Sequence, residues 1–100
     1  MNLFPAIVQV VPGKDYTVYA YCNDGAVRLV DMAPLIQKGG VFEPLKNQDF
    51  FNEKLTVLND TVAWDLKGDR DETACIDIDP FWIFETAPVV DDPLRDEMGA

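Results

Sequence analysis

The chain has 100 residues, 48% of them hydrophobic and 11% aromatic, which is enough for one hydrophobic core and too few for two domains. Eighteen acidic residues outnumber eight basic ones, and the resulting net charge of −10 argues against direct binding to nucleic acid. The chain contains neither histidine nor serine, which excludes Ser-His-Asp and Cys-His catalysis and histidine-ligated metals.

Three strands are predicted in the N-terminal part. The first covers Ala6 to Val11, a β-branched run that ends at a proline–glycine turn. The second covers Tyr16 to Cys22 and alternates between two faces. We expect Asp24 and Gly25 to form a two-residue type I′ loop that leads into the third strand, Ala26–Val30.

The expected loop length fixes the register of this hairpin. Val18 and its alternate neighbours then face the core, while Tyr21 lies opposite Arg28 and Tyr19 lies opposite Val30 on the other face. Aromatic rings beside a cation make an unusually adhesive solvent-facing surface. We therefore predict a partner-binding face formed by Tyr19, Tyr21 and Arg28.

Two short helices are predicted next. Asp31 is placed to cap a helix that ends at Lys38, where Gly39–Gly40 supplies a stop. Asn47 is placed to cap a second helix that carries Phe50 and its neighbour toward the core. Neither helix is long enough to be stable alone.

A second hairpin is predicted from two short apolar runs. Leu55–Leu58 and Thr61–Trp64 flank Asn59–Asp60, a dipeptide suited to a tight turn. This register sets Leu55 opposite Trp64 and supplies the core with a large aromatic side chain.

A last strand and helix complete the predicted domain. Residues Ala74–Asp79 alternate as a strand with one wet face, and Asp79 followed by Pro80 is typical of a helix cap and first position. We therefore predict a single α+β domain over residues 1–85. The acidic, proline-containing segment 86–100 is expected to be a disordered tail.

The expected cellular location follows from features that the sequence lacks. No run of about 18 apolar residues is present, and the N-terminus has no basic start followed by an apolar core, so we expect neither a membrane span nor export. Cys22 and Cys75 lie far apart, which favours reduced thiols over a disulfide scaffold. These features together predict a cytoplasmic protein.

Carboxylates gather in the acidic stretch 65–79. Calcium and magnesium bind several such oxygens, but a calcium loop that starts at Asp69 fails because Ala74 replaces the required glycine. No glycine-rich phosphate cradle is present either. We predict no catalytic, cofactor or metal site, and we keep a small-molecule or divalent-cation site near Asp77 and Asp79 as an alternative function.

The order of several short motifs between Tyr16 and Glu85, about seven tenths of the chain, resembles a small bacterial family known as domain of unknown function 2442. The motifs are Asp24–Gly25 before a strand, Leu29 and Val30 before Asp31, Gly39–Leu45, Phe50 or Phe51, Val62–Trp64 and Cys75–Pro80.

The resemblance implies an α+β fold and brings no established activity. Some relatives carry a helix-turn-helix DNA-binding domain after this module, and members are often encoded beside another small protein, which implies a regulatory or antitoxin-like pairing. We expect this chain to depart from the first arrangement, because the segment after Glu85 is acidic and too short for three helices.

Three hypotheses about function result. The first is a non-enzymatic interaction module that binds a small basic protein or a second copy of itself. The second is the ligand site near Asp77 and Asp79. The third is that the chain has no site, with Asp79 capping a helix, Trp64 and Trp82 filling the core, and Tyr21 covering Arg28.

Overall fold

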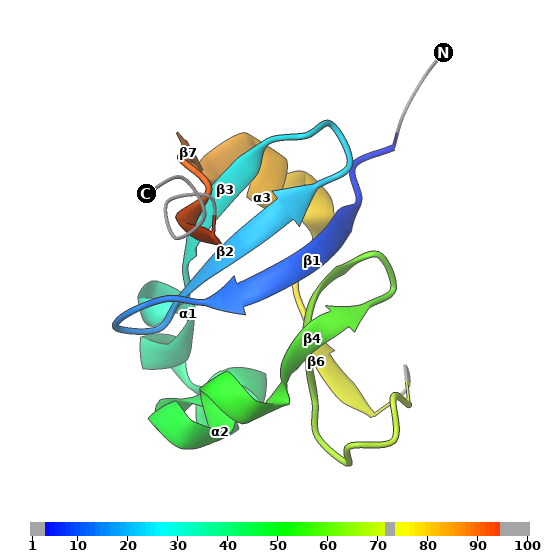
Figure 1. Cartoon of the computed structure of the whole chain (residues 1–100). Helices are drawn as coiled ribbons and strands as arrows, with labels where there is room; N and C mark the ends of the chain where they lie inside the picture. The colour runs from blue at the N-terminus through cyan, green and yellow to red at the C-terminus, as the bar shows by residue number, and fades with distance from the viewer. Residues whose placement is uncertain (1–3, 72–73, 95–100) are drawn as a thin grey trace.

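The structure is a computed structural model that describes residues 4–71 and 74–94. Within these residues, two antiparallel sheets and a set of short helices form an α+β fold, as the sequence predicts (Figure 1). The first sheet has the order β1-β2-β3-β7, with β1 Ile7–Pro12, β2 Thr17–Cys22, β3 Val27–Asp31 and β7 Val89–Val90. The second has the order β4-β5-β6, with β4 Leu55–Leu58, β5 Thr61–Asp65 and β6 Cys75–Asp77. The helices are α1 Ala33–Lys38, the 3-10 helix η1 Gly40–Lys46, α2 Gln48–Lys54 and α3 Pro80–Thr86.

The core is built around Trp64, which is fully buried. Its indole N–H donates to the Phe51 carbonyl at 3.0 Å, and the two rings lie 5.2 Å apart between centroids. Tyr16 meets Phe51 edge-on at 5.4 Å, and its hydroxyl donates to the Lys46 carbonyl. These contacts join β5 to α2 and to the turn that precedes β2.

Strand β1 connects the two sheets, because it contacts β4 and β5 of the second sheet as well as pairing with β2. The Ile7 N–H donates to the Asp60 carbonyl in the β4–β5 turn at 2.7 Å. Ile7 itself is almost completely buried. The sheets therefore share one hydrophobic core.

The predicted register of the first hairpin is wrong by one residue. The Cys22 N–H donates to the Ala26 carbonyl at 2.9 Å, so the loop has three residues and ends at Gly25, whose φ of +89° is the left-handed region open to glycine. A three-residue loop of this kind is the common alternative to a type I′ turn. Ala20 consequently pairs with Arg28, and Tyr21 pairs with Val27.

The second hairpin confirms its predicted register. Leu55 pairs with Trp64, and the strands are joined by Asn59 and Asp60, which both have a positive φ. A type I′ turn needs this geometry at both central positions, and asparagine and aspartate tolerate it better than most residues. The prediction is confirmed here because the sequence offers no three-residue loop that would compete with the two-residue turn.

The predicted helix caps are confirmed at two of three positions. The Asn47 side chain accepts from the backbone N–H groups of Asp49 and Phe50, and the Asp79 side chain accepts from the N–H of Phe81 at 2.9 Å. The first helix differs, because it begins one position later than expected and has Met32 at its cap.

The expectation of a disordered tail from residue 86 is wrong for the described part of that segment. Ala87 is buried, and β7 extends the first sheet by pairing with β3, beside which it lies in Figure 1. The backbone of Pro88 accepts from the Leu29 N–H at 2.9 Å. The edge of β3 has backbone groups that can pair with this segment. These hydrogen bonds and the burial of small apolar side chains together hold the segment against the sheet. Residues 95–100 lie outside the described part.

We predict that Phe51→Ala lowers the free energy of unfolding by about 3–5 kcal/mol, because it removes a fully buried ring that packs on Trp64. Phe81→Ala is the matched control, since Phe81 is 51% exposed and should lose about 1 kcal/mol or less. Urea denaturation measures both variants. Equal losses would contradict the assignment of the core.

Candidate functional site

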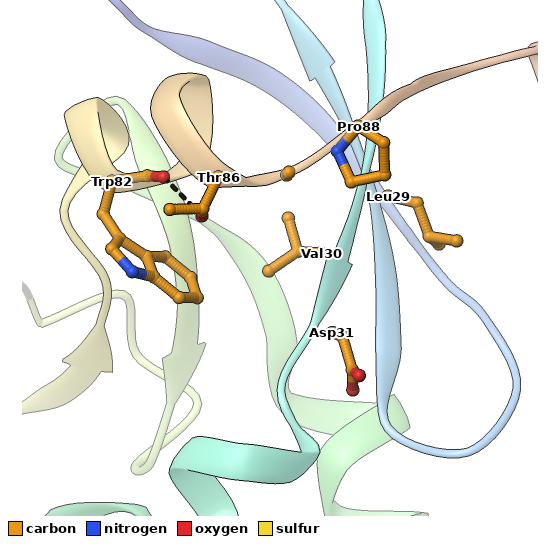
Figure 2. Close-up of a pocket in the computed structure, with 7 residues that line it drawn as sticks. Leu29, Val30, Asp31, Trp82, Thr86 and Pro88 are labelled. Carbon is orange, nitrogen blue, oxygen red and sulfur yellow. Dashed lines mark hydrogen bonds between the residues drawn. The ribbon is translucent and has the colours of Figure 1, made fainter.

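Two surface hollows share Trp82 as a wall. The first, the β3 hollow, has a volume of about 170 Å³ and lies between β3 at Val30 and Asp31 and the end of α3 at Thr86. Figure 2 shows Trp82 and Thr86 on α3 across from Val30 and Asp31 on β3. The second, the β6 hollow, has a volume of about 370 Å³. It is lined by Leu35, Phe42, Asp77, Ile78, Asp79 and Trp82.

Local sequence explains why Trp82 reaches both hollows. Asp79 caps α3 and Pro80 occupies its first position, so the chain turns into a helix directly after β6. Ile83 then faces the core and is fully buried, while the neighbouring Trp82 is only half-buried. Trp82, which we expected to fill the core, packs against the core but is only partly buried, and it also lines both hollows beside α1, β3 and β6.

Three carboxylates lie at these hollows. Asp31 lines the β3 hollow, and Asp77 and Asp79 line the β6 hollow. Each accepts a hydrogen bond from another described residue. Asp31 accepts from the Ala33 N–H at 3.0 Å, Asp79 from the Phe81 N–H at 2.9 Å, and Asp77 from the Asn59 side chain at 3.4 Å. These are the bonds of caps and turns rather than of ion pairs.

Among residues 4–71 and 74–94, no basic side chain lines either hollow. Within the described residues, none of the three carboxylates is paired with a lysine or arginine, whereas Lys46 forms an ion pair with Glu43 at 3.1 Å. Two arginines are used elsewhere: Arg28 bonds to the Ala87 carbonyl, and Arg70 bonds to the Val57 carbonyl. The surface around Trp82 therefore combines apolar walls with uncompensated negative charge.

The predicted face of Tyr19, Tyr21 and Arg28 is not a single surface. Because side chains alternate along a strand, the one-residue change of register moves Arg28 to the opposite face of the sheet from both tyrosines. There its guanidinium lies 5.0 Å from the centroid of Phe84 and donates to the Ala87 carbonyl at 2.8 Å. Arg28 thus fastens α3 and the segment after it to β3.

Tyr21 is engaged with the C-terminal segment instead. Its hydroxyl donates to the Asp92 carboxylate at 2.5 Å. Burial and this neighbouring carboxylate together raise the pKa of Tyr21 to about 12. The phenol is therefore a structural donor at neutral pH, and Tyr19 is left as the half-buried ring beside it.

The cysteines do not form a reactive site. Cys22 is buried on the core face of β2, and burial raises the pKa of its thiol, which favours the protonated and poorly nucleophilic form. Cys22 is a free thiol.

The alternative metal site meets a geometric limit. Asp77 and Asp79 share the β6 hollow, as the sequence suggested, but the described residues contain no group of three or more histidine, cysteine or carboxylate side chains placed to hold an ion. Calcium needs about six to eight oxygen ligands and magnesium six. Two carboxylates at an apolar hollow suit a positively charged side chain or organic group better than a metal ion.

The sequence indicated neither the two hollows that Trp82 lines nor that Asp31 lines one of them. The four consecutive apolar residues after Pro80, Phe81–Phe84, indicated only a short apolar helix. The available signal was that Trp82 and Ile83 are adjacent, so a helix of 3.6 residues per turn cannot bury both equally.

We predict that Asp79→Ala lowers the free energy of unfolding by about 1 kcal/mol, because the N-cap bond to the Phe81 N–H is lost. Asp79→Asn should lose little, because an asparagine oxygen caps a helix as well as an aspartate. Thermal and urea denaturation of both variants measure the difference. An equally large loss in Asp79→Asn would show that the charge, rather than the cap, stabilises α3.

A second prediction concerns Tyr21. Its pKa is about 12 in the folded chain and 10.0 in the unfolded reference, so its stabilising contribution is complete below about pH 10 and is lost as the pH rises to about 12. Tyr21→Phe should therefore lose stability less steeply than the wild type across this window. Tyr19→Phe, on the same face of β2, is the control and should follow the wild type. Denaturation curves at several pH values test this; identical slopes for all three proteins would refute it.

Among the described residues, no helix combines the length and the apolar character needed to cross a membrane. Searches of curated proteins and of solved structures found no match to this chain. A family model described as "Protein of unknown function (DUF2442)" matches residues 7–88, a span that runs from the start of β1 to the residue before β7. The chain belongs to the DUF2442 family of proteins of unknown function.

Proposed function

We propose that this chain is a non-enzymatic interaction module that binds a small basic protein through the surface around Trp82. The observation that carries the proposal is the juxtaposition of a half-buried indole, two apolar hollows and three carboxylates that have no basic partner in the described part of the chain. Aromatic residues are enriched among the side chains that dominate binding energy at interfaces. The negative rim supplies complementarity to a positively charged partner.

The net charge of −10 supports the same partner class. A strongly charged protein attracts a partner of opposite sign over distances up to the Debye length, about 8 Å at physiological salt, and this raises the association rate. Like-charged proteins are rejected by the same field. The charge thus contributes selectivity, and the hollows contribute the apolar contact area.

In this proposal the module acts in the cytoplasm, where it controls a partner by covering the partner's basic surface. Such covering is how a regulatory or antitoxin-like protein inhibits a target that must itself reach an anionic ligand. The chain needs no catalytic group for this role, which is consistent with its lack of histidine and serine. The outer face of β2 at Tyr19 and Tyr21 is a separate surface through which self-association could occur.

A pull-down tests the proposal. The tagged chain, exposed to lysate of its native cell at physiological salt, should recover one stoichiometric small basic protein. The purified pair should re-form a complex, and the affinity should fall steeply as salt is raised, because charge complementarity is screened. Light scattering on the chain alone is the companion measurement. A monomer or self-dimer that recovers no such protein would contradict the proposal.

A further inference from the structure

The β6 hollow has a composition that restricts its occupant. Leu35 from α1 and Phe42 from η1, two elements adjacent in sequence, line it together with Trp82 from the distant α3. Asp77 and Asp79 line the same hollow from the end of β6 and the cap of α3. Its volume of about 370 Å³ lies at the lower end of the range for small-ligand pockets, about 300–1,000 Å³.

A wholly apolar occupant fits this lining poorly. It would take water away from Asp77 and Asp79 without offering either of them a hydrogen bond, and desolvating an unpaired carboxylate is costly. An anionic occupant would be repelled. An arginine side chain satisfies both parts of the lining, because its aliphatic stem packs on apolar walls and its planar guanidinium donates to carboxylates and stacks on indole.

We propose that the β6 hollow receives an arginine side chain from a basic segment of the partner. The guanidinium pairs with Asp77 and Asp79 at the rim, and the stem and cationic plane lie against Trp82. This inference rests on the proposed function and deepens it, because it assigns the recognition of the basic partner to one hollow rather than to the net charge of the chain. Lysine offers the same charge without a planar stacking surface.

A peptide titration tests the assignment. The probe is a short, end-blocked peptide of alternating arginine and leucine, followed by the two indole N–H signals in the NMR spectrum of the full chain. The Trp82 signal should shift on titration. The Trp64 signal is the internal reference and should stay in place, because that indole is fully buried and bonded to the Phe51 carbonyl. The corresponding lysine–leucine peptide should bind more weakly.

Two double variants with the same net charge separate the hollow from the overall field. Asp77→Asn/Asp79→Asn removes both carboxylates of the hollow, and asparagine keeps the helix cap at residue 79. Asp24→Asn/Asp49→Asn removes two exposed carboxylates that line neither hollow. We expect the first variant to bind the arginine–leucine peptide about tenfold more weakly, and the second about twofold or less.

Two results would overturn the inference while leaving the proposed function in place. One is an equal loss of peptide affinity in the two double variants. The other is binding without a shift of the Trp82 signal. Either result would show that the chain binds the peptide through its overall negative charge rather than through the β6 hollow. Failure of the wild type to bind any cationic peptide also overturns the assignment of the hollow, and the pull-down with the purified pair then decides the proposed function independently.

Discussion

The contact between Trp64 and Phe51 determines how the parts of this fold are arranged. Trp64 is the largest fully buried side chain, and its indole N–H must find a partner because an unpaired buried donor would cost about 1–3 kcal/mol. The Phe51 carbonyl at 3.0 Å provides it, which places α2 against β5. Tyr16 then packs on the other side of the cluster and brings the first sheet to the same point. Both sheets therefore share one core, and the short helices depend on it for their stability.

The C-terminal part of the domain is fastened by a second set of contacts, centred on Arg28. Its guanidinium lies over Phe84 and donates to the Ala87 carbonyl, so one side chain of β3 holds both α3 and the segment that follows it. This attachment fixes where Trp82 stands relative to β3. The β3 hollow lies where α3 is held beside that strand, and Trp82, which also packs against the core, forms one of its walls. Arg28, which we predicted to contact a partner, thus helps to position Trp82 beside the β3 hollow.

The charge distribution around Trp82 has a physical cause in how the chain uses its few basic residues. Eight stand against eighteen acidic residues, and the arginines at 28 and 70 are engaged by backbone carbonyls in the described structure. The carboxylates at 31, 77 and 79 stay close to water because they cap or flank element ends. An apolar surface bordered by carboxylates is complementary to a cationic side chain.

The sequence by itself determined the α+β class, most of the strands, the second hairpin with its register, and the caps at Asn47 and Asp79, because each depends on residues near one another in the chain. Tertiary structure decided the first hairpin, where two-residue and three-residue loops compete and Gly25 suits both. That choice carries Arg28 to the core-facing side of the sheet. It also decided that Val89 and Val90 add to β3 and that Trp82 forms two hollows with α1, β3 and β6. These features depend on which elements meet in space, and local sequence patterns carry no record of that.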